Sequence, residues 1–149
     1  MIYLGVDPGA SGALVAITEG GQWQGSIRNK ATPAERWEWI SALTSCHCRA
    51  ALENVHSFPG QGVSSTFKFG ASFGRCEMLL VCAQIPYELV SPSVWQRGLN
   101  VPPRRGKTKT EHKRGLREMA QRLWPSAKVT SAEADAALMA EWLRRKQCQ

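Results

Sequence analysis

The sequence predicts an α/β protein built on a five-stranded mixed sheet that is flanked by helices. Short apolar, β-branched runs alternate with longer segments of helical composition, and turn signals separate them. Short turns link the first three runs, which is typical of an antiparallel meander, whereas helices separate the later runs, which is typical of parallel strands. A length of 149 residues suits one compact domain and is too short for two ordinary ones. We therefore expect residues 1–149 to form a single domain.

The first three predicted strands lie at the start of the chain. Ile2–Asp7 is an apolar run that Pro8-Gly9 stops, as expected of a buried strand that ends in a turn. Gly12–Thr18 is a second such run, and the turn signal Glu19-Gly20-Gly21 separates it from a third strand at Gln22–Arg28. These strands are predicted to form the antiparallel part of the sheet.

The rest of the chain alternates between helices and strands before it ends in helices. Thr32-Pro33-Ala34-Glu35 combines an N-cap, a first-turn proline and a capping-box acid, which predicts a helix that runs to about Leu43. The other predicted elements are a strand at Arg49–Asn54, a Gly/Ser/Pro-rich loop at His56–Ser65, a helix at Thr66–Ala83, a strand at Tyr87–Val90, a short helix from Ser91-Pro92 through Arg97, a basic loop at Val101–Thr108, and helices at Thr110–Leu123 and Ala132–Lys146. The order is therefore βββαβαβααα.

The charge of the chain favours a polyanionic partner. Lys and Arg together number 19 against 12 acidic residues, which gives a net charge of +7. The basic residues are concentrated in residues 104–117, where Glu111 is the one acidic residue. The seven basic residues there are Arg104, Arg105, Lys107, Lys109, Lys113, Arg114 and Arg117. A second cluster, Arg144-Arg145-Lys146, closes the last predicted helix. The alternative is that these residues form a solvated face that only keeps the protein in solution.

The remaining composition argues against several other classes of protein. An odd number of cysteines, five, points to a reducing interior rather than to a disulfide framework. Cys46-His47-Cys48 lacks a second ligand pair at the spacing of a zinc site. No apolar run reaches the roughly 18 residues that a membrane-spanning helix needs. We therefore expect a cytoplasmic protein without a membrane partner.

Three acids occupy positions that suit a metal-dependent nuclease. Asp7 and Glu53 each close an apolar strand, where an unpartnered carboxylate is costly, and Asp135 lies near the start of the last helix. Hard Mg²⁺ ions prefer oxygen ligands, and two such ions can activate water and stabilise a leaving oxygen. Each acid also has a simpler interpretation: Asp7 as a turn-former, Glu53 as a surface residue and Asp135 as a favourable helix-start charge.

The motifs around these acids resemble those of the RuvC-type junction resolvases of the ribonuclease H-like superfamily. Asp7-Pro8-Gly9-Ala10-Ser11-Gly12 is similar to the first acidic motif of that family, and Ala51-Leu52-Glu53-Asn54-Val55-His56 is similar to the second. The stretch from Pro59 to Gly70, followed by Gly74, resembles the loop and helix of the phage-type members. Lys113, six residues before Met119, resembles their phosphate-contacting lysine, and Asp135-Ala136-Ala137-Leu138 their last acidic motif.

This resemblance implies a ribonuclease H-like fold and a structure-selective endodeoxyribonuclease that resolves four-way (Holliday) DNA junctions. It implies two Mg²⁺ ions per site, replaceable by Mn²⁺, held by Asp7, Glu53 and Asp135, and hydrolysis that leaves 5′-phosphate ends. Lys113 would neutralise charge on the reacting phosphate. The resemblance implies a bacterial or phage-infected bacterial cell as the host and no nucleotide cofactor. The resemblance also implies a homodimer, and the apolar helix around Gly74, Met78, Leu79 and Cys82 is the candidate interface; alternatively, that face only covers the sheet.

The resemblance also suggests which residues contact DNA. The basic loop and the following helix would hold phosphates without reading bases. The residues involved would be Arg104, Arg105, Lys107, Lys109, Lys113 and, from the predicted helix Thr66–Ala83, Lys68. Phe67 or Phe69 could wedge at an unstacked branch point, or both could be core or dimer contacts.

One position departs from the family pattern. The family usually carries another acid or a His about three residues before the last Asp, and this chain has Ala132 there. Glu133 is the candidate substitute as a metal ligand, although two residues apart on a regular helix would point it away from Asp135.

Three other functions remain open from the sequence. A ribonuclease H or another branched-DNA nuclease would use the same acids. A non-catalytic junction-binding protein is conceivable because of Ala132. The segment Asp7–Gly12 also resembles the first phosphate loop of sugar kinases and actin-like ATPases, but those proteins need a second lobe for which 149 residues leave no room.

Overall fold

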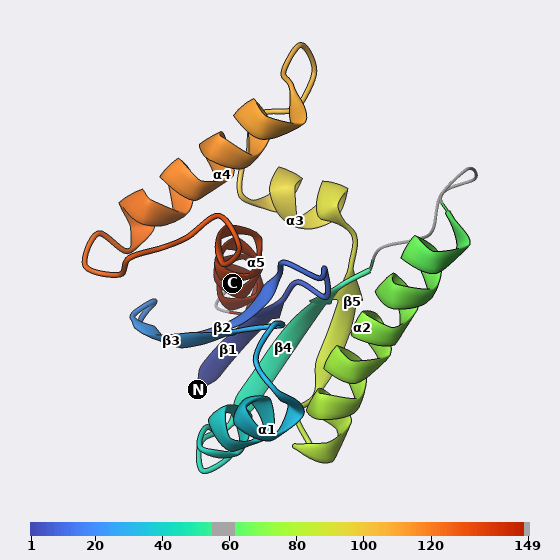
Figure 1. Cartoon of the computed structure of the whole chain (residues 1–149). Coiled ribbons are helices and arrows are strands. Elements are labelled where there is room, and N and C mark those ends of the chain that lie inside the picture. The colour runs from blue at the N-terminus through green and yellow to red at the C-terminus, as the bar shows by residue number, and fades with distance from the viewer. Residues whose placement is uncertain (55–61, 148–149) are drawn as a thin grey trace.

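Five strands form one mixed sheet in the computed structural model, which describes residues 1–54 and 62–147 (Figure 1). The strands are β1 (Ile2–Val6), β2 (Ala13–Thr18), β3 (Trp23–Arg28), β4 (Cys48–Glu53) and β5 (Tyr87–Val90), and their order in the sheet is β3-β2-β1-β4-β5. The pairs β1–β2 and β2–β3 are antiparallel, whereas β1–β4 and β4–β5 are parallel. The predicted meander followed by parallel strands is confirmed.

Among the described residues, five helices complete the fold in the predicted order. They are α1 (Pro33–Ser41), α2 (Val63–Cys82), α3 (Pro92–Gly98), α4 (Lys109–Leu123) and α5 (Ala134–Gln147). The predicted capping box of α1 is present, because Thr32 Oγ1 accepts from the Glu35 amide and the Glu35 carboxylate accepts from the Thr32 amide. Thr108 and Glu111 form a second capping box at α4. None of the helices in the described ranges is long and apolar enough to cross a bilayer.

Some helix ends differ from the prediction. α1 ends at Ser41 rather than near Leu43, because the amide of Leu43 bonds Ile40 in a tighter turn. α2 begins three residues before the predicted Thr66, at Val63. α5 begins at Ala134 rather than Ala132, because residues 131–133 form a turn that the Glu133 side chain closes onto Thr130. Of the predicted loop His56–Ser65, residues 56–61 lie outside the described part of the chain.

Helices cover both faces of the sheet (Figure 1). Along each strand, successive side chains point to opposite faces. Leu4, Val6 and Leu52 belong to the apolar cluster that includes residues of α1 and α2. Tyr3 and Ala51 belong to the other cluster, which α5 and residues of α3 and α4 complete. The sheet is therefore the middle layer, and α5 defines the face towards which odd-numbered residues of β1 point.

α5 approaches β1 unusually closely. A Cβ atom added to Gly5 would lie 1.8 Å from the carbonyl oxygen of Ala136 and 2.7 Å from the amide nitrogen of Ala140. Only a glycine on the strand and small residues on the helix permit this distance. The small-residue face of α5 therefore packs directly against the sheet.

Candidate active site

Asp7 and Glu53 lie side by side at the carboxyl ends of two central strands. In the parallel pair β1–β4, Gly5 is opposite Ala51 and Val6 is opposite Leu52, so the next pair in register is Asp7 and Glu53. Alternation of side chains directs both acids to the face of the sheet that α5 covers. Strand register alone therefore brings together two acids that are 46 positions apart in the sequence.

Asp135 and Lys113 reach the same end of the sheet from two helices. Asp135 lies in the first turn of α5. Lys113, in the second turn of α4, places Nζ 3.8 Å from Asp135 Oδ2. The lysine side chain is 43% exposed and that of Asp135 only 16%, so the lysine reaches from the surface towards a mostly buried carboxylate.

Burial and mutual repulsion make these acids hard to ionise. The pKa of Glu53 is raised to about 7, and burial is the largest cause. The negative charges of Asp7 and Asp135 raise it further. The hydrogen bond from Trp95 and the positive charge of Lys113 lower it, but not enough to offset these effects. Burial also raises the pKa of Asp135 to about 6, against the attraction of Lys113. The pKa of Asp7 is likewise raised by burial, although the Gly9 amide and Lys113 oppose this. The site is therefore short of positive charge.

The turn after β1 fixes the position of Asp7. Asp7 Oδ1 accepts a hydrogen bond of 2.8 Å from the Gly9 amide. Asn29 Nδ2 donates to the carbonyl oxygens of Asp7 and Gly9, both at 2.7 Å. Gly12 packs so closely that a Cβ would lie 2.3 Å from the Asp7 carbonyl oxygen. Sequence analysis did not identify Asn29, because nothing in its neighbourhood indicates that the end of the third strand meets the first turn.

Trp95 is a second residue that the sequence did not reveal. Its indole Nε1 donates a 3.1 Å hydrogen bond to Glu53 Oε1, and the side chain is fully buried. Because a buried tryptophan N–H usually finds a hydrogen-bond acceptor, the sequence could have indicated that Trp95 donates a hydrogen bond to some buried polar group. The identity of its acceptor depends on the fold.

The donor set suits a hard divalent cation, but the carboxylates are not gathered on one point. Oxygen ligands are those that Mg²⁺ and Mn²⁺ prefer, and a cation would offset the charge repulsion that raises the pKa of Glu53 and Asp135. Within residues 1–54 and 62–147, however, no three acidic, histidine or cysteine side chains are close enough together to hold an ion as oriented. Asp7, Glu53 and Asp135 are turned instead towards Gly9, Trp95 and Lys113. Binding would require these side chains to reorient.

Glu133 is engaged away from the other acids. Its Oε1 accepts a 2.6 Å hydrogen bond from Ser26, and its Oε2 accepts from both the amide and the hydroxyl of Thr130. Burial alone would raise the pKa of Glu133, but these hydrogen bonds outweigh burial and leave the pKa lowered. The structure thus brings together Asp7, Glu53, Asp135 and Lys113, and gives Glu133 a structural position between β3 and the start of α5.

Most of the residues predicted to contact DNA lie on the surface. A groove of about 480 Å³ runs along α4 to Lys113, and its lining consists of Lys109, Thr110, Lys113, Arg114, Arg117 and Ser131. Arg104, Arg105 and Lys107 are exposed in the preceding loop. On α2, Lys68 is exposed, Phe69 is half-buried and Phe67 is 76% exposed, so Phe67 is not a core residue of this chain.

Comparisons with known proteins identify the fold. No family model and no curated protein sequence matches the chain. Among solved structures, it resembles RuvC of Thermus thermophilus, with 17% identity and a TM-score of 0.59 over 99% of this chain and 97% of that one. It also resembles T. thermophilus RuvC in complex with a Holliday junction substrate, with 16% identity and a TM-score of 0.66 over 99% and 96% of the two chains. The chain has the RuvC fold, and the expected ribonuclease H-like architecture is confirmed.

Proposed function

We propose that the protein is a metal-dependent endodeoxyribonuclease that resolves four-way DNA junctions. The observation that carries this proposal is the convergence of Asp7, Glu53 and Asp135, together with Lys113, at one end of the sheet of a RuvC fold. The structurally similar RuvC chain is in complex with a Holliday junction substrate. The basic groove along α4 leads to Lys113 and supplies a route for a phosphate backbone.

Each residue of the site has a chemical role in this proposal. Asp7, Glu53 and Asp135 would hold the cation, whereas Glu133 is left out of the set because its oxygens are occupied by Ser26 and Thr130. Two Mg²⁺ or Mn²⁺ ions, when bound, would supply Lewis-acid activation of water and charge neutralisation at the phosphate. Lys113 adds a positive charge beside the scissile phosphate, where charge increases in the transition state. The oxygen of a water molecule would form a bond to phosphorus as the bond from phosphorus to the 3′ oxygen breaks. The products would be a 5′ phosphate and a 3′ hydroxyl, which takes up a proton.

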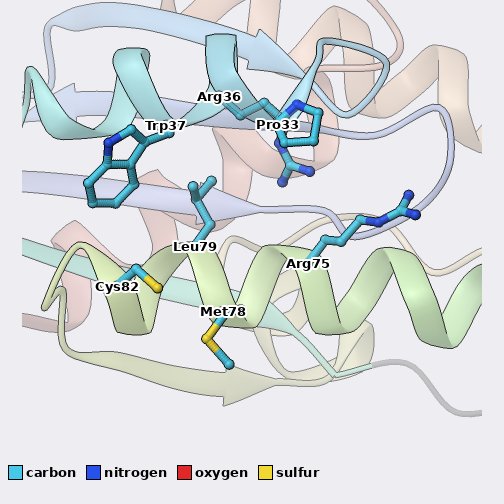
Figure 2. Close-up of a pocket in the computed structure, with 7 residues that line it drawn as sticks. All are labelled: Pro33, Arg36, Trp37, Arg75, Met78, Leu79 and Cys82. Atoms are coloured by element: carbon cyan, nitrogen blue, oxygen red, sulfur yellow. The ribbon is translucent and has the colours of Figure 1, made fainter.

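A homodimer would let two sites cut opposing strands of a two-fold junction. The candidate interface is the groove between α1 and α2, of about 230 Å³, which Trp37, Met78, Leu79 and Cys82 help to line (Figure 2). Met78 is 57% exposed and Trp37 is 46% exposed, which leaves apolar surface for a partner, whereas Leu79 packs against the core cluster on this face of the sheet. The groove shares no residue with the acidic site. Analytical ultracentrifugation of the wild type and of Met78→Glu tests this interface. We expect the wild type to sediment as a dimer and Met78→Glu as a monomer.

Cleavage of synthetic DNA tests the enzymatic proposal. A four-way junction, a linear duplex, a branched duplex and an RNA–DNA hybrid are incubated with the protein in Mg²⁺, Mn²⁺ or EDTA. We expect paired nicks on opposing strands of the junction, with 5′-phosphate ends, in either metal only. Asp7→Asn is the matched variant, because it keeps the shape of the side chain and its hydrogen bond to Gly9 while it removes the charge.

The other outcomes select the competing functions. Preferential cleavage of the hybrid would assign a ribonuclease H activity, and preferential cleavage of another branched substrate would assign a broader nuclease. Tight junction binding without cleavage in either metal would leave a junction-binding protein and reject the catalytic proposal.

A further inference from the structure

Asn29 holds the main chain of the turn that carries Asp7. Its side-chain nitrogen Nδ2 has two N–H groups, and it donates to the carbonyl oxygens of Asp7 and Gly9, both at 2.7 Å. The main-chain amide of Asp7 donates to the carbonyl oxygen of Ala13 at 3.0 Å. Both main-chain polar groups of Asp7 therefore have partners, which fixes the direction of its Cα–Cβ bond. None of these main-chain bonds constrains the side-chain torsions of Asp7, so its carboxylate can still turn.

Two buried residues orient the side-chain amide of Asn29. Cys76, on α2, donates weakly from Sγ to Asn29 Oδ1 at 3.8 Å, and Arg36, on α1, donates from Nη2 to Cys76 Sγ at 3.2 Å. Burial raises the pKa of the Cys76 thiol, although the charge of Arg36 and its hydrogen bond oppose this, so the thiol keeps its proton at neutral pH and can donate. With Oδ1 held on this side, Nδ2 faces the turn.

We propose that Asn29 is a positioning residue for junction cleavage, which keeps Asp7 in place beside Glu53. Cys76 and Arg36 support this role because they orient the Asn29 amide. The proposal rests on the proposed function, because cleavage is the activity that it serves. A reacting group that is displaced by about 1 Å can cost about 100-fold in rate, so a firm hold on this turn matters for catalysis.

Gln121 provides a matched control in the same molecule. Its Nε2 donates to the carbonyl oxygens of Trp124, Pro125 and Ala127, at 3.2, 3.4 and 2.8 Å, so it also holds a turn through carbonyl groups. Like Asn29, it is half-buried. None of its partners is an acid of the candidate site. Asn29→Leu and Gln121→Met each replace an amide with an apolar side chain of similar size, so an effect that comes only from a loosened turn is common to both.

The experiment measures the single-turnover rate of junction cleavage at saturating protein, and separately the affinity for the junction in EDTA. We expect Asn29→Leu to cleave about 10–100-fold more slowly. Its affinity should stay at the wild-type value, because Asn29 is not among the residues that line the basic groove. Gln121→Met should keep both values. A wild-type rate in Asn29→Leu, or an equal loss of rate in the two variants, would reject the role of Asn29.

Arg36→Met separates positioning from stability. Arg36 is 5% exposed, its Nε has no hydrogen-bond partner, and none of the carboxylates in residues 1–54 and 62–147 forms an ion pair with it. An unpaired buried charge is costly, so an apolar side chain of similar length should leave the melting temperature unchanged or raise it. We nevertheless expect slower cleavage, because Cys76 loses its donor. A wild-type rate in Arg36→Met would reject the part of the proposal that concerns Arg36.

Hydrogen exchange tests the hold on the turn without DNA or metal. The amides of Gly9 and Gly12 donate to Asp7 Oδ1 and to the Gly9 carbonyl oxygen, both at 2.8 Å, and NMR follows their exchange. Because a hydrogen bond contributes about 1 kcal/mol, we expect exchange about 10-fold faster in Asn29→Leu and unchanged in Gln121→Met. If Asn29→Leu does not fold, the wild type decides. Side-chain amide protons of Asn29 that exchange as fast as those of exposed Asn100 would contradict the proposal.

The failures of the two proposals are distinguishable. If the wild type cleaves the junction and Asn29→Leu cleaves it equally fast, the role of Asn29 is rejected while the nuclease stands. If the wild type cleaves no DNA, the nuclease is rejected, and the exchange rates alone decide whether Asn29 holds the turn.

Discussion

At the scale of the residue, the candidate site combines the carboxyl groups of Asp7, Glu53 and Asp135 with one nearby positive charge, that of Lys113. Each carboxyl is buried enough to raise its pKa, and the nearest cation, Lys113, is itself partly exposed. In a stable protein such a cluster lowers stability when its members are ionised. Its free energy therefore depends on pH and on any cation that binds there.

Glu53→Gln should stabilise the protein at high pH. Because the pKa of Glu53 in the folded state, about 7, lies above its ordinary value of 4.5, the stability that its proton supplies is present below about pH 4.5 and is lost as the pH rises through 7. Glutamine cannot ionise and still accepts the Trp95 hydrogen bond. We expect a gain of up to about 3 kcal/mol at pH 8 and little at pH 4.5, measured by urea unfolding.

Exposed Glu38 supplies the control, since Glu38→Gln should change stability little at either pH. A Glu53→Gln variant that is no more stable than wild type at pH 8 would show that Glu53 is not destabilised by its surroundings.

Mg²⁺ should raise the melting temperature of the wild type more at pH 8 than at pH 5. The ion binds carboxylates in their ionised form. Because the pKa of Glu53 is about 7 and that of Asp135 about 6, both side chains are mostly protonated at pH 5 and mostly ionised at pH 8. The measurement is a thermal melt at both pH values with and without the ion. An equal rise in Glu53→Gln would place the ion elsewhere.

Lys113→Met should lower the rate of junction cleavage by about 10²–10³-fold, the usual effect of removing one group that stabilises transition-state charge. Single-turnover rates with saturating protein separate this loss from weaker binding. Lys30→Met, which removes an exposed lysine from another part of the chain, is the control. A Lys113→Met enzyme that cleaves at the wild-type rate would restrict Lys113 to its ion pair with Asp135.

The identities of the three acids could be predicted from the sequence, whereas their partners could not. Asp7 and Glu53 follow apolar strands, which is a local pattern. The hydrogen bonds from Asn29 and Trp95 join segments that are 22 and 42 residues apart, and no local pattern encodes them. Glu133 shows the same limit, because only the structure reveals that Ser26 and Thr130 occupy its oxygens.

At the scale of the element, the contact between α5 and β1 positions the third acid. Gly5→Ala should destabilise the protein by at least about 3 kcal/mol, because the new methyl group meets backbone atoms of Ala136 and Ala140 that cannot move independently. Gly115→Ala is the opposite case: a Cβ there meets nothing within 4 Å, so it should stabilise α4 by about 0.5–1 kcal/mol. Urea unfolding of both variants tests the pair, and a mild Gly5→Ala would mean that α5 can slide on the sheet.

Element ends were predictable where the signal is local. The capping box at Thr32 and Glu35 fixes the start of α1 in both sequence and structure. The start of α5 was placed two residues early, because Glu133 resembles a first-turn acid but instead bonds Thr130 and Ser26, and the second of these partners lies on β3.

At the scale of the whole molecule, the order of elements was enough to predict the sheet, because three closely spaced strands followed by helix-linked strands allow few arrangements. The register of β1 with β4, which places Asp7 beside Glu53, came only from the structure. The same holds for the groove along α4, since its residues come from α4 and from Ser131 in another segment.

Binding of the junction should weaken steeply with salt. With a net charge of +7 and a basic groove that leads to the acids, about six phosphate contacts would cost roughly a thousandfold in affinity between 50 and 200 mM salt. Arg117→Met should reduce the salt slope by about one. Fluorescence anisotropy in Ca²⁺ or EDTA measures both, and a slope that Arg117→Met leaves unchanged would place the DNA outside this groove.

The separation of the three acids along the chain also has a consequence for synthesis on the ribosome. Asp7 and Glu53 can pair as soon as β1 and β4 have emerged, but Asp135 is added only after about nine-tenths of these 149 residues. Its helix packs on the first strand, and contacts over so long a loop form late and slowly during folding. A growing chain therefore holds only two of the three acids until Asp135 has been added, 82 residues after Glu53, and the acidic site stays incomplete through most of the synthesis of these residues.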